Sequence, residues 1–539
     1  MTSKSMKFLY PNKCAMKKIK YNLLIGLLLL ESSIGLSAQT EDNNEESVAQ
    51  LDLYRQEAFT FDRSDASALA LGQWKSYSNI YVGINYKDGT FHRPQQSSSA
   101  TDYLFSAEGA LKMGEYRIAG GFSLEQSYNK NVRFNSIIDP YRGTPYILAD
   151  STGGNWQKQS YALWAKGASP FFHNLVSVGL DLQLNVDRGS KKIDPRPQSN
   201  VNSISVAPSV TLKQNDFSLG AYIRYRRFRE NSNLILYNTN EPQKIYMLKG
   251  MGQYVYDIFS NNERERQYQG DGLGYGLTFG VNNEHISMDV YADYANYTED
   301  AMDIESNKPR KRGCFYETHY TGGTHINIYS QRAKHLIAAS YFWQERSGRE
   351  IIQIFNSSPT INAWQTDSEA PRRSVNKQTA AKGSYSLFLF GNNRQKEKDD
   401  YLWKFDLEAT YETYSDTYKV MDSYLEYAAC HVEGGVTHNI ALKGNNSLLI
   451  HVNGGYHSPS KKSFSYTERE TADPTIAQGL IYPDRDILWS SYYTVGGDVT
   501  FNHQLAKSGT LYLRVGYQSL QAQHNLQRNT VWARFGYIF

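Results

Sequence analysis

The chain has 539 residues, a formal net charge of +3 and a mean hydropathy of −0.58, and 14% of its residues are aromatic, 42 of them Tyr. Such a polar, ring-rich chain suits a large soluble all-β protein or a β-barrel in a lipid bilayer. Beyond residue 72 the sequence has no run of about eighteen consecutive apolar residues, which excludes transmembrane helices.

The first 38 residues have the features of an export signal. Lysines between positions 13 and 20 precede an apolar run over 23–30, and small residues at Ser37 and Ala38 provide a cleavage point. Met16 is an alternative start, and a retained membrane anchor is the second interpretation. No Cys follows the apolar run at the cleavage point, which argues against a lipoprotein. We therefore expect a signal peptide over residues 1–38.

Cleavage would remove most of the positive charge. The remaining chain carries about 51 basic and about 53 acidic residues, a net charge near −2, so no nucleic-acid partner is indicated. Two cysteines remain, Cys314 and Cys430, and whether they pair stays open.

Residues 39–75 form an N-terminal segment without strand-like alternation. Residues 47–54 predict a short helix, and residues 62–70 predict a turn-rich link. Whether this segment lies in the lumen of the barrel described next or extends into the periplasm stays open.

From residue 76 onward, apolar and polar residues alternate with period two. Every even position from Val176 to Val186 is apolar, whereas the odd positions between Ser177 and Asn185 are small or polar. The same pattern recurs over 217–224 and over 401–409, where Lys404, Asp406 and Glu408 form the polar side. A charged inner face fits a hydrated lumen better than a sandwich core.

The alternation predicts about eighteen strands, with a range of about 16–18. They are expected at 78–87, 101–112, 115–128, 155–167, 175–187, 202–213, 217–229, 273–281, 286–297, 315–329, 333–344, 379–390, 401–414, 424–440, 447–457, 488–503, 509–520 and 528–539.

The connections between these strands alternate in length. Tight turns near residues 113, 214, 283, 331, 444 and 507 alternate with long polar stretches over 129–154, 230–272, 345–378 and 458–487, and the second of these stretches could contain a further hairpin at 245–258. We therefore expect residues 76–539 to form an all-β fold, a transmembrane antiparallel β-barrel with short periplasmic turns and long extracellular loops.

The chain ends inside the last strand with Phe535, Tyr537 and Phe539 at alternate positions. This ending is typical of bacterial outer-membrane barrels, in which the barrel-assembly machinery reads it. These three residues are the predicted assembly signal.

Two loop regions carry a more specific resemblance. Asp139–Tyr146 with Ala149–Gly154, and Gly189–Pro197, are similar to an uncharacterised family of Bacteroidota outer-membrane β-barrel proteins, a domain of unknown function. The similarity covers most of the mature chain, including residues 83–94. It implies the fold and the bacterial outer membrane as the location, but no substrate and no catalytic residues.

The same Pro- and Gly-rich loops could fold inward and constrict a pore. Asp139, Arg142, Asp194 and Arg196 are the candidates, because opposite charges can pair across a stiff loop. The alternative is an outer loop held rigid against proteases.

The even or odd position of a residue in its strand, called here its parity, decides which face it lies on and predicts further pore-lining residues. Arg224 and Arg226 belong to a basic cluster and should face the lumen, where they would attract anionic solutes; binding of lipopolysaccharide phosphates at the rim is the alternative. Lys404, Asp406 and Glu408 should line another wall, where ordinary salt bridges are the simpler interpretation.

The sequence gives little reason to expect an enzyme. Its twelve His residues are dispersed, and residues 151–154 lack the spacing of a nucleophile elbow. We expect no catalytic residues, no metal site and no cofactor.

The expected function is a channel or transporter for a small solute across the outer membrane. The alternative is a non-conducting barrel that anchors a surface or secretion complex. Expected partners are outer-membrane lipid, lipopolysaccharide, the barrel-assembly machinery and a surface lipoprotein. The solute, its conduction and the oligomeric state stay open.

Overall fold

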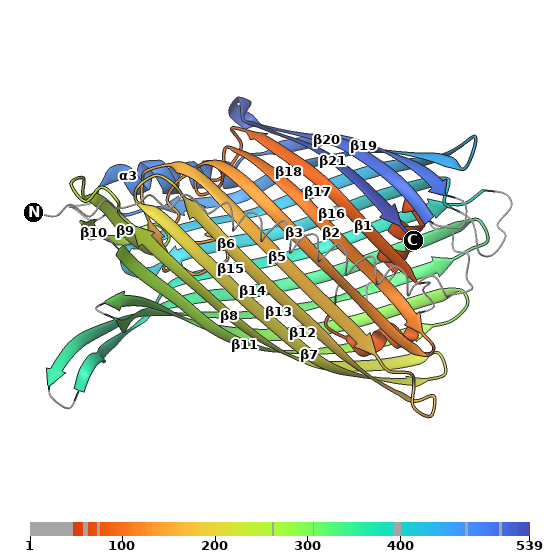
Figure 1. Cartoon of the computed structure of the whole chain (residues 1–539), viewed down its shortest axis with the longest axis horizontal. Coiled ribbons are helices and arrows are strands. Elements are labelled where there is room, and N and C mark those ends of the chain that lie inside the picture. The colour runs from red at the N-terminus through yellow and green to blue at the C-terminus, as the bar shows by residue number, and fades with distance from the viewer. Residues whose placement is uncertain are drawn as a thin grey trace, which may run out of the picture. The chain divides into compact units, whose positions relative to one another are not determined.

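The computed structural model describes residues 47–57, 63–72, 76–260, 263–305, 307–358, 361–391, 400–468, 473–505 and 509–539. The expected signal peptide, residues 1–38, lies outside the described residues. Most of the described residues form one 18-stranded sheet that closes on itself as a barrel (Figure 1).

The barrel strands follow one another along the chain. They are β1 (Tyr77–Gly89), β2 (Ser99–Met113), β3 (Tyr116–Val132), β5 (Gly154–Ala168), β6 (Val176–Lys191), β7 (Arg196–Gln214), β8 (Phe217–Ile235), β11 (Glu263–Asn282), β12 (Ile286–Glu305), β13 (Lys308–Tyr329), β14 (Ala333–Ser358), β15 (Ile361–Leu389), β16 (Trp403–Tyr418), β17 (Ser423–Leu442), β18 (Asn446–Ser465), β19 (Tyr492–Leu505), β20 (Gly509–Ala522) and β21 (Gln527–Ile538).

Closure is made by the first and last strands. β1 pairs antiparallel with β2 on one side and with β21 on the other, with Ile84 opposite Ala533 in the second pairing. Each remaining strand pairs antiparallel with its neighbours in sequence. The predicted fold class and the predicted strand count are therefore confirmed. A closed sheet has no free edge, so every barrel strand finds backbone partners on both sides.

Side-chain exposure follows the predicted alternation. On β6, Val178, Leu180 and Leu182 are 48%, 42% and 41% exposed, whereas Ser177 and Asp181 are 0% and 2% exposed. The outer face of the barrel is thus apolar and open, and the inner face is polar and covered. This is the reverse of a soluble globule, and it is the arrangement that a bilayer requires.

The two ends of the barrel differ. One end, called here the short-turn end, carries the turns that join β2 to β3, β7 to β8, β11 to β12, β13 to β14 and β17 to β18. Positive backbone φ angles at Gly114, Asn215 and Asn445 let these turns reverse within a few residues. The predicted turn at 506–508 lies outside the described residues. The opposite end is called the long-loop end.

Strands extend further toward the long-loop end than the alternation predicted. The predicted loop 345–378 is largely a continuation of β14 and β15, which form a hairpin that projects beyond the barrel (Figure 1). The alternation did not predict this extension. Outside the apolar band the strands face no lipid, so their outward-facing residues need not be apolar and the period-two pattern is lost.

Smaller elements gather at the long-loop end. β4 (Leu148–Ala149), β9 (Gln243–Gly250) and β10 (Gln253–Phe259) form a separate three-stranded sheet, which confirms the predicted hairpin at 245–258. The expected start of a strand at 488 is wrong, because α3 (Pro474–Ile476), η4 (Ala477–Ile481) and α4 (Tyr482–Leu488) precede β19. Two short turns, η3 (Lys419–Met421) and η5 (Gln523–Asn525), complete the described elements of this part.

The prediction for Tyr401 is also wrong. The alternation over 401–409 places Tyr401 opposite the polar side formed by Lys404, Asp406 and Glu408, and hence on the outer face, but it is 1% exposed and packs edge-on against Phe388, with ring centroids 5.2 Å apart. β16 begins only at Trp403, so the parity of that strand does not extend to Tyr401.

Within the described residues no helix has both the length and the hydrophobicity to cross a membrane, a criterion that says nothing about strands.

Candidate functional site: the barrel lumen

The inner segment, defined as residues 47–57 and 63–72, lies against the inner wall at the short-turn end. It contains α2 (Val48–Glu57) and η2 (Ala66–Leu71). Val48, Leu51 and Leu69 form one apolar cluster with inward-facing side chains near the strand ends; the wall contributes Tyr77, Ala110, Ala119, Ala168, Tyr512 and Ile538. Small wall residues leave room for the segment, which therefore buries its apolar face against the barrel.

Polar contacts fix the same segment. The backbone N–H of Ser67 donates to Ser209 Oγ (2.8 Å), and Lys166 Nζ donates to the carbonyl oxygen of Arg63 (2.6 Å). Gly179 on β6 lies so close that an added Cβ would collide with the backbone nitrogen of Ser67. The register of η2 on the wall therefore depends on a glycine.

The inward loop, defined as residues 133–153 between β3 and β5, occupies the lumen at the long-loop end. Phe134, Ile137 and Tyr146 are at most 3% exposed and belong to the largest apolar cluster, which also holds Phe228 and Tyr268 of the wall. Tyr268 Oη donates to the carbonyl oxygen of Tyr146 (2.7 Å). The loop therefore has its own core inside the barrel.

Arg142 of this loop is buried between two carboxylates. Its Nη1 donates to Glu299 Oε2 (2.5 Å), and its Nε lies 3.4 Å from Glu230 Oε2. The guanidinium also lies over the rings of Phe228 and Tyr268, 4.7 and 4.8 Å from their centroids. The side chains of Glu230 and Glu299 are 0% exposed, so Arg142 is the cation that compensates their burial.

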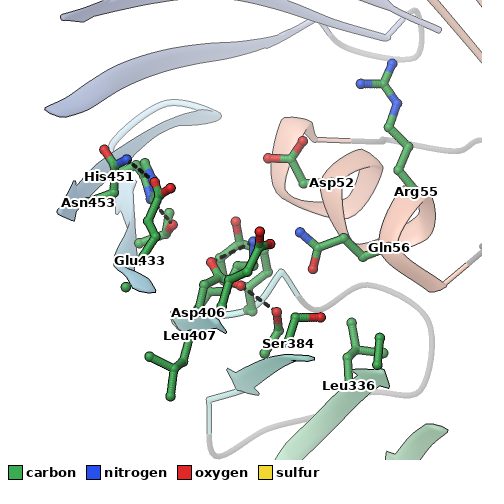
Figure 2. Close-up of a pocket in the computed structure, with 18 of the residues that line it drawn as sticks. Asp52, Arg55, Gln56, Leu336, Ser384, Asp406, Leu407, Glu433, His451 and Asn453 are labelled. Carbon is green, nitrogen blue, oxygen red and sulfur yellow. Dashed lines mark hydrogen bonds and ion pairs between the residues drawn. The ribbon is translucent and has the colours of Figure 1, made fainter. Parts of the chain in front are cut away.

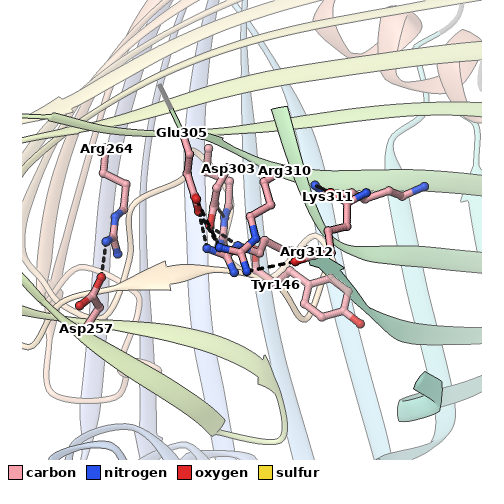
Figure 3. A network of polar contacts seen from close by, with 10 residues as sticks. Tyr146, Asp257, Arg264, Asp303, Glu305, Arg310, Lys311 and Arg312 are labelled. Carbon is pink, nitrogen blue, oxygen red and sulfur yellow. Dashed lines mark hydrogen bonds and ion pairs between the residues drawn. The ribbon is translucent and has the colours of Figure 1, made fainter. Parts of the chain in front are cut away.

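A second charge network lies beside the loop and stiffens the wall. Asp303 on β12 accepts from Arg266 Nε (2.6 Å) and from Arg312 Nε (2.7 Å), and Glu305 accepts from Arg312 Nη2 (2.6 Å) (Figure 3). Arg266 Nη1 reaches the carbonyl oxygen of Tyr146 (3.4 Å), which links this network to the inward loop.

The helices from α3 to α4 cover the inward loop. Ile476 and Leu480 join its apolar cluster, and Asp484 accepts two hydrogen bonds from Arg93, both 2.6 Å long. Asp473 precedes α3 and accepts from Lys244 Nζ (2.6 Å) and Tyr246 Oη (2.8 Å) on β9. The hydrogen bond from Lys244 is the main reason that the pKa of Asp473 lies well below its usual value.

Between the two occupied ends lies a cavity of about 720 Å³. Strands β13 to β20 form one side of it and α2 the other (Figure 2). Asp52 and Gln56 point from the helix toward Asp406 and Glu433 on the strands. We call this space the lumen cavity.

Most charges in the lumen cavity are paired. Lys404 Nζ lies 2.9 Å from Asp406 Oδ2, Lys382 Nζ lies 2.8 Å from Glu408 Oε1, and Arg514 Nε lies 2.8 Å from Asp498 Oδ2. The structure thus brings Lys404, Asp406 and Glu408 together in one cavity, within salt bridges.

The arginines at 224 and 226 lie on the inner face of β8. Arg224 Nη2 lies 3.2 Å from Asp293 Oδ1 of β12, and its Nη1 lies 3.3 Å from Ser64 Oγ of the inner segment. The guanidinium of Arg226 lies 5.3 Å from the ring centroid of Tyr297.

The four loop candidates do not form one cluster. Asp194 binds Arg196 Nε (2.6 Å) and accepts from the backbone N–H groups of Tyr237 and Asn238, so this pair closes the β6–β7 turn. Asp139 is exposed and accepts from the N–H of Tyr141. Among these four residues, Arg142 alone contacts the inner wall of the described barrel.

The C-terminal aromatic residues lie along the closing seam. Phe535 faces outward and is 54% exposed, Tyr537 and Phe539 stack with ring centroids 5.2 Å apart, and Phe539 exchanges backbone hydrogen bonds with Ser78. Cys314 and Cys430 are both free thiols. In the described part of the chain, no three His, Cys, Asp or Glu side chains are grouped to hold a metal ion.

Sequence reasoning missed Glu230, Glu299, Asp52 and Glu433. Strand parity could have found Glu230, because it has the same parity as Arg224 and Arg226, but the predicted strand ended at residue 229. Asp52 had no comparable signal, since α2 contacts the wall through residues far apart in the sequence.

Comparisons with known proteins give a family and a general likeness of fold. No curated protein matches the sequence of this chain. The ferric preacinetobactin receptor BauA of Acinetobacter baumannii has 8% identity and a TM-score of 0.37 over 85% of this chain and 80% of its own. OccK1 (OpdK) of Pseudomonas aeruginosa has 9% identity and a TM-score of 0.34 over 86% and 98%.

The copper transporter OprC has 8% identity and a TM-score of 0.38 over 87% of this chain and 81% of its own. These structural similarities are too distant to indicate a function. The model of a family of unknown function (DUF6850) matches residues 66–539, and the chain belongs to that family.

Proposed function

We propose that this protein is a bacterial outer-membrane β-barrel that passes a small solute through its lumen, and that the pathway opens only when the inner segment or the inward loop moves. The observation that carries the proposal is a closed 18-stranded cylinder with an apolar outer face and a charged inner face. A cylinder of this size is wide enough for an aqueous channel unless other parts of the chain fill it.

The filled ends support a gated pathway. The inner segment packs against the short-turn end through Leu51 and Leu69, and the inward loop occupies the long-loop end through Phe134 and Tyr146. The inner segment and the inward loop each bury apolar side chains against the wall and add a few hydrogen bonds or ion pairs to it. We therefore expect a solute to reach the lumen cavity more easily once one of these contacts is released.

Location and partners follow from the same proposal. The signal peptide over residues 1–38 directs export, and Phe535, Tyr537 and Phe539 are read by the barrel-assembly machinery. Outer-membrane lipid and lipopolysaccharide surround the apolar band, and a surface lipoprotein delivers the solute to the long-loop end. The protein acts without catalysis.

Conductance of the purified mature chain in planar bilayers tests the proposal. We expect a low or intermittent conductance from the native protein, and a higher one when both contacts are weakened in the double variant Gly179→Ala with Arg142→Ala. The matched control is Gly167→Ala with Arg196→Ala. An added Cβ at Gly167 meets nothing within 4 Å, and Arg196 pairs with Asp194 outside the lumen.

If the native chain and the double variant are both silent while the protein is folded in the bilayer, transport is wrong. A non-conducting barrel that anchors a surface or secretion complex then remains.

A further inference from the structure

The lumen cavity holds an excess of negative charge. Three of its four Lys and Arg side chains, Lys382, Lys404 and Arg514, have a carboxylate partner that also lines the cavity. The fourth, Arg55, pairs with Glu108, which lies outside the lining. Among the described residues, two lining carboxylates, those of Asp52 and Glu433, therefore form no salt bridge with Lys or Arg, although Arg514 and Lys404 act on Asp52 from a greater distance.

These two carboxylates come from opposite sides of the cavity. Asp52 projects from α2, and Glu433 projects from β17 (Figure 2). The Asp52 side chain makes no hydrogen bond or ion pair with any residue that the structure describes. Glu433 accepts from Asn453 Nδ2 (2.6 Å) and lies 3.5 Å from His431 Nε2. Neither carboxylate is therefore in direct contact with a Lys or Arg side chain that lines the cavity.

The rest of the lining suits a hydrogen-bonding organic molecule. Asn327, Gln56, Ser384 and Thr500 offer neutral donors and acceptors, and Leu336 and Leu449 supply apolar surface. A volume of about 720 Å³ lies in the range of pockets that hold small organic ligands, about 300–1,000 Å³. A bare inorganic ion would leave most of this volume unused.

We propose that the lumen cavity binds a small polar solute that carries a primary ammonium group, with Asp52 and Glu433 as the carboxylates that hold this group. The inference rests on the proposed function, because it names the class of solute that passes. It also gives α2 a second role, since the helix that closes the short-turn end supplies one of the two carboxylates. Displacement of the helix would then release the solute.

Binding measurements on the full mature chain in detergent test this proposal. The probes are glucosamine, which is cationic at pH 6, and N-acetylglucosamine, which has the same ring but no charge. Isothermal titration, or saturation-transfer NMR for weak binding, should detect glucosamine with at least about tenfold preference, as a charge-assisted contact predicts. The preference should fall as ionic strength rises.

Two variants locate the site. Asp52→Asn and Glu433→Gln should each weaken glucosamine binding by about tenfold and leave the weak N-acetylglucosamine signal unchanged. Glu369→Gln is the matched control, because Glu369 pairs with Arg349 on the projecting β14–β15 hairpin. Hydrogen exchange over residues 47–57 in Asp52→Asn shows whether α2 keeps its place, and Glu433→Gln tests the site without touching α2.

Equal binding of the two sugars, binding of neither, or binding that survives both substitutions would overturn the proposal. Swelling of proteoliposomes in glucosamine separates it from the proposed function. Binding without swelling leaves the site standing and contradicts transport, whereas swelling without preference for the amine contradicts the site alone.

Discussion

Arg142 Nη1 donates a hydrogen bond of 2.5 Å to Glu299 Oε2, so a loop that leaves the barrel after β3 is tied back to β12 inside the lumen. The carboxylate of Glu230 on β8 lies on the other side of the same guanidinium. One cation thus joins three segments that are distant in sequence. A second buried ion pair, from Lys191 Nζ of β6 to Asp150 Oδ1 (2.9 Å), ties the same loop to the wall.

Replacing Arg142 by Ala should release the inward loop. Two buried carboxylates would lose their cation, which typically costs about 3–5 kcal/mol. We expect faster hydrogen exchange over residues 133–153 and new protease sites there, with the barrel itself still folded. Arg196→Ala, which breaks a partly exposed pair outside the lumen, should leave this exchange unchanged. Unaltered protection in Arg142→Ala would show that the apolar packing and the remaining polar contacts of the loop hold it without this ion pair.

A single added methyl group at Gly179 should displace the inner segment. The new Cβ would collide with the backbone nitrogen of Ser67, and overpacking of this kind costs about 1–3 kcal/mol. Hydrogen exchange over residues 63–72 should rise in Gly179→Ala. Gly167→Ala carries the same change on the neighbouring strand β5, where the space is open, and should match the native protein. Equal exchange in both variants would refute a close contact between η2 and β6.

The closing seam can be tested by a disulfide. Ile84 and Ala533 are paired residues of β1 and β21, at a separation that suits a disulfide. With Cys314 and Cys430 replaced by Ser, the pair Ile84→Cys with Ala533→Cys should oxidise spontaneously and change mobility on a non-reducing gel. Ile84→Cys with Val531→Cys is out of register by two residues and should stay reduced. A crosslink in both pairs, or in neither, would contradict the register.

Acid should loosen the helices that cover the inward loop. Asp473 has a pKa below its usual value of about 3.9, chiefly because Lys244 donates to it. A carboxylate with a lowered pKa stabilises the folded state above its unfolded pKa, and this contribution is lost as the pH falls from about 4 toward the lower folded value.

Pepsin, which is active in this range, should therefore cut near residues 473–489 increasingly as the pH falls. When cleavage is normalised to that of an unfolded substrate at each pH, Asp473→Asn should show a weaker pH dependence than the native chain, because residue 473 then has no charge to lose. A pH-independent cleavage of the native chain would contradict a role for the Lys244–Asp473 contact.

Much of the fold could be predicted from sequence because a barrel strand obeys a local rule. Val178, Leu180 and Leu182 face outward and Ser177 and Asp181 face inward, since successive side chains on a strand point to opposite faces. All eighteen strands were located in this way. The predicted strand boundaries are wrong where this rule does not apply. At Tyr401 the strand has not yet begun, and along the projecting part of β14 and β15 no lipid faces the chain.

The contents of the lumen were harder to predict. Parity located Arg224, Lys404 and Asp406 on the inner face, and Lys404 and Asp406 pair with each other along β16, but the partners of Arg224 lie on β12 and on the inner segment. Arg142 was proposed to fold inward from its place in a stiff charged loop, whereas Asp194 and Arg196 in a similar loop close a turn instead. Local sequence does not distinguish these two loops.

The alternation, the turns and hence a closed barrel can be read from the sequence alone, because each depends on residues only a few positions apart. The position of Arg142 between Glu230 and Glu299, and the presence of Asp52 and Glu433 in one cavity, follow from the three-dimensional fold. These relations join residues up to hundreds of positions apart. Closure of the sheet brings them together, and no local periodicity records which inward-facing side chains will meet.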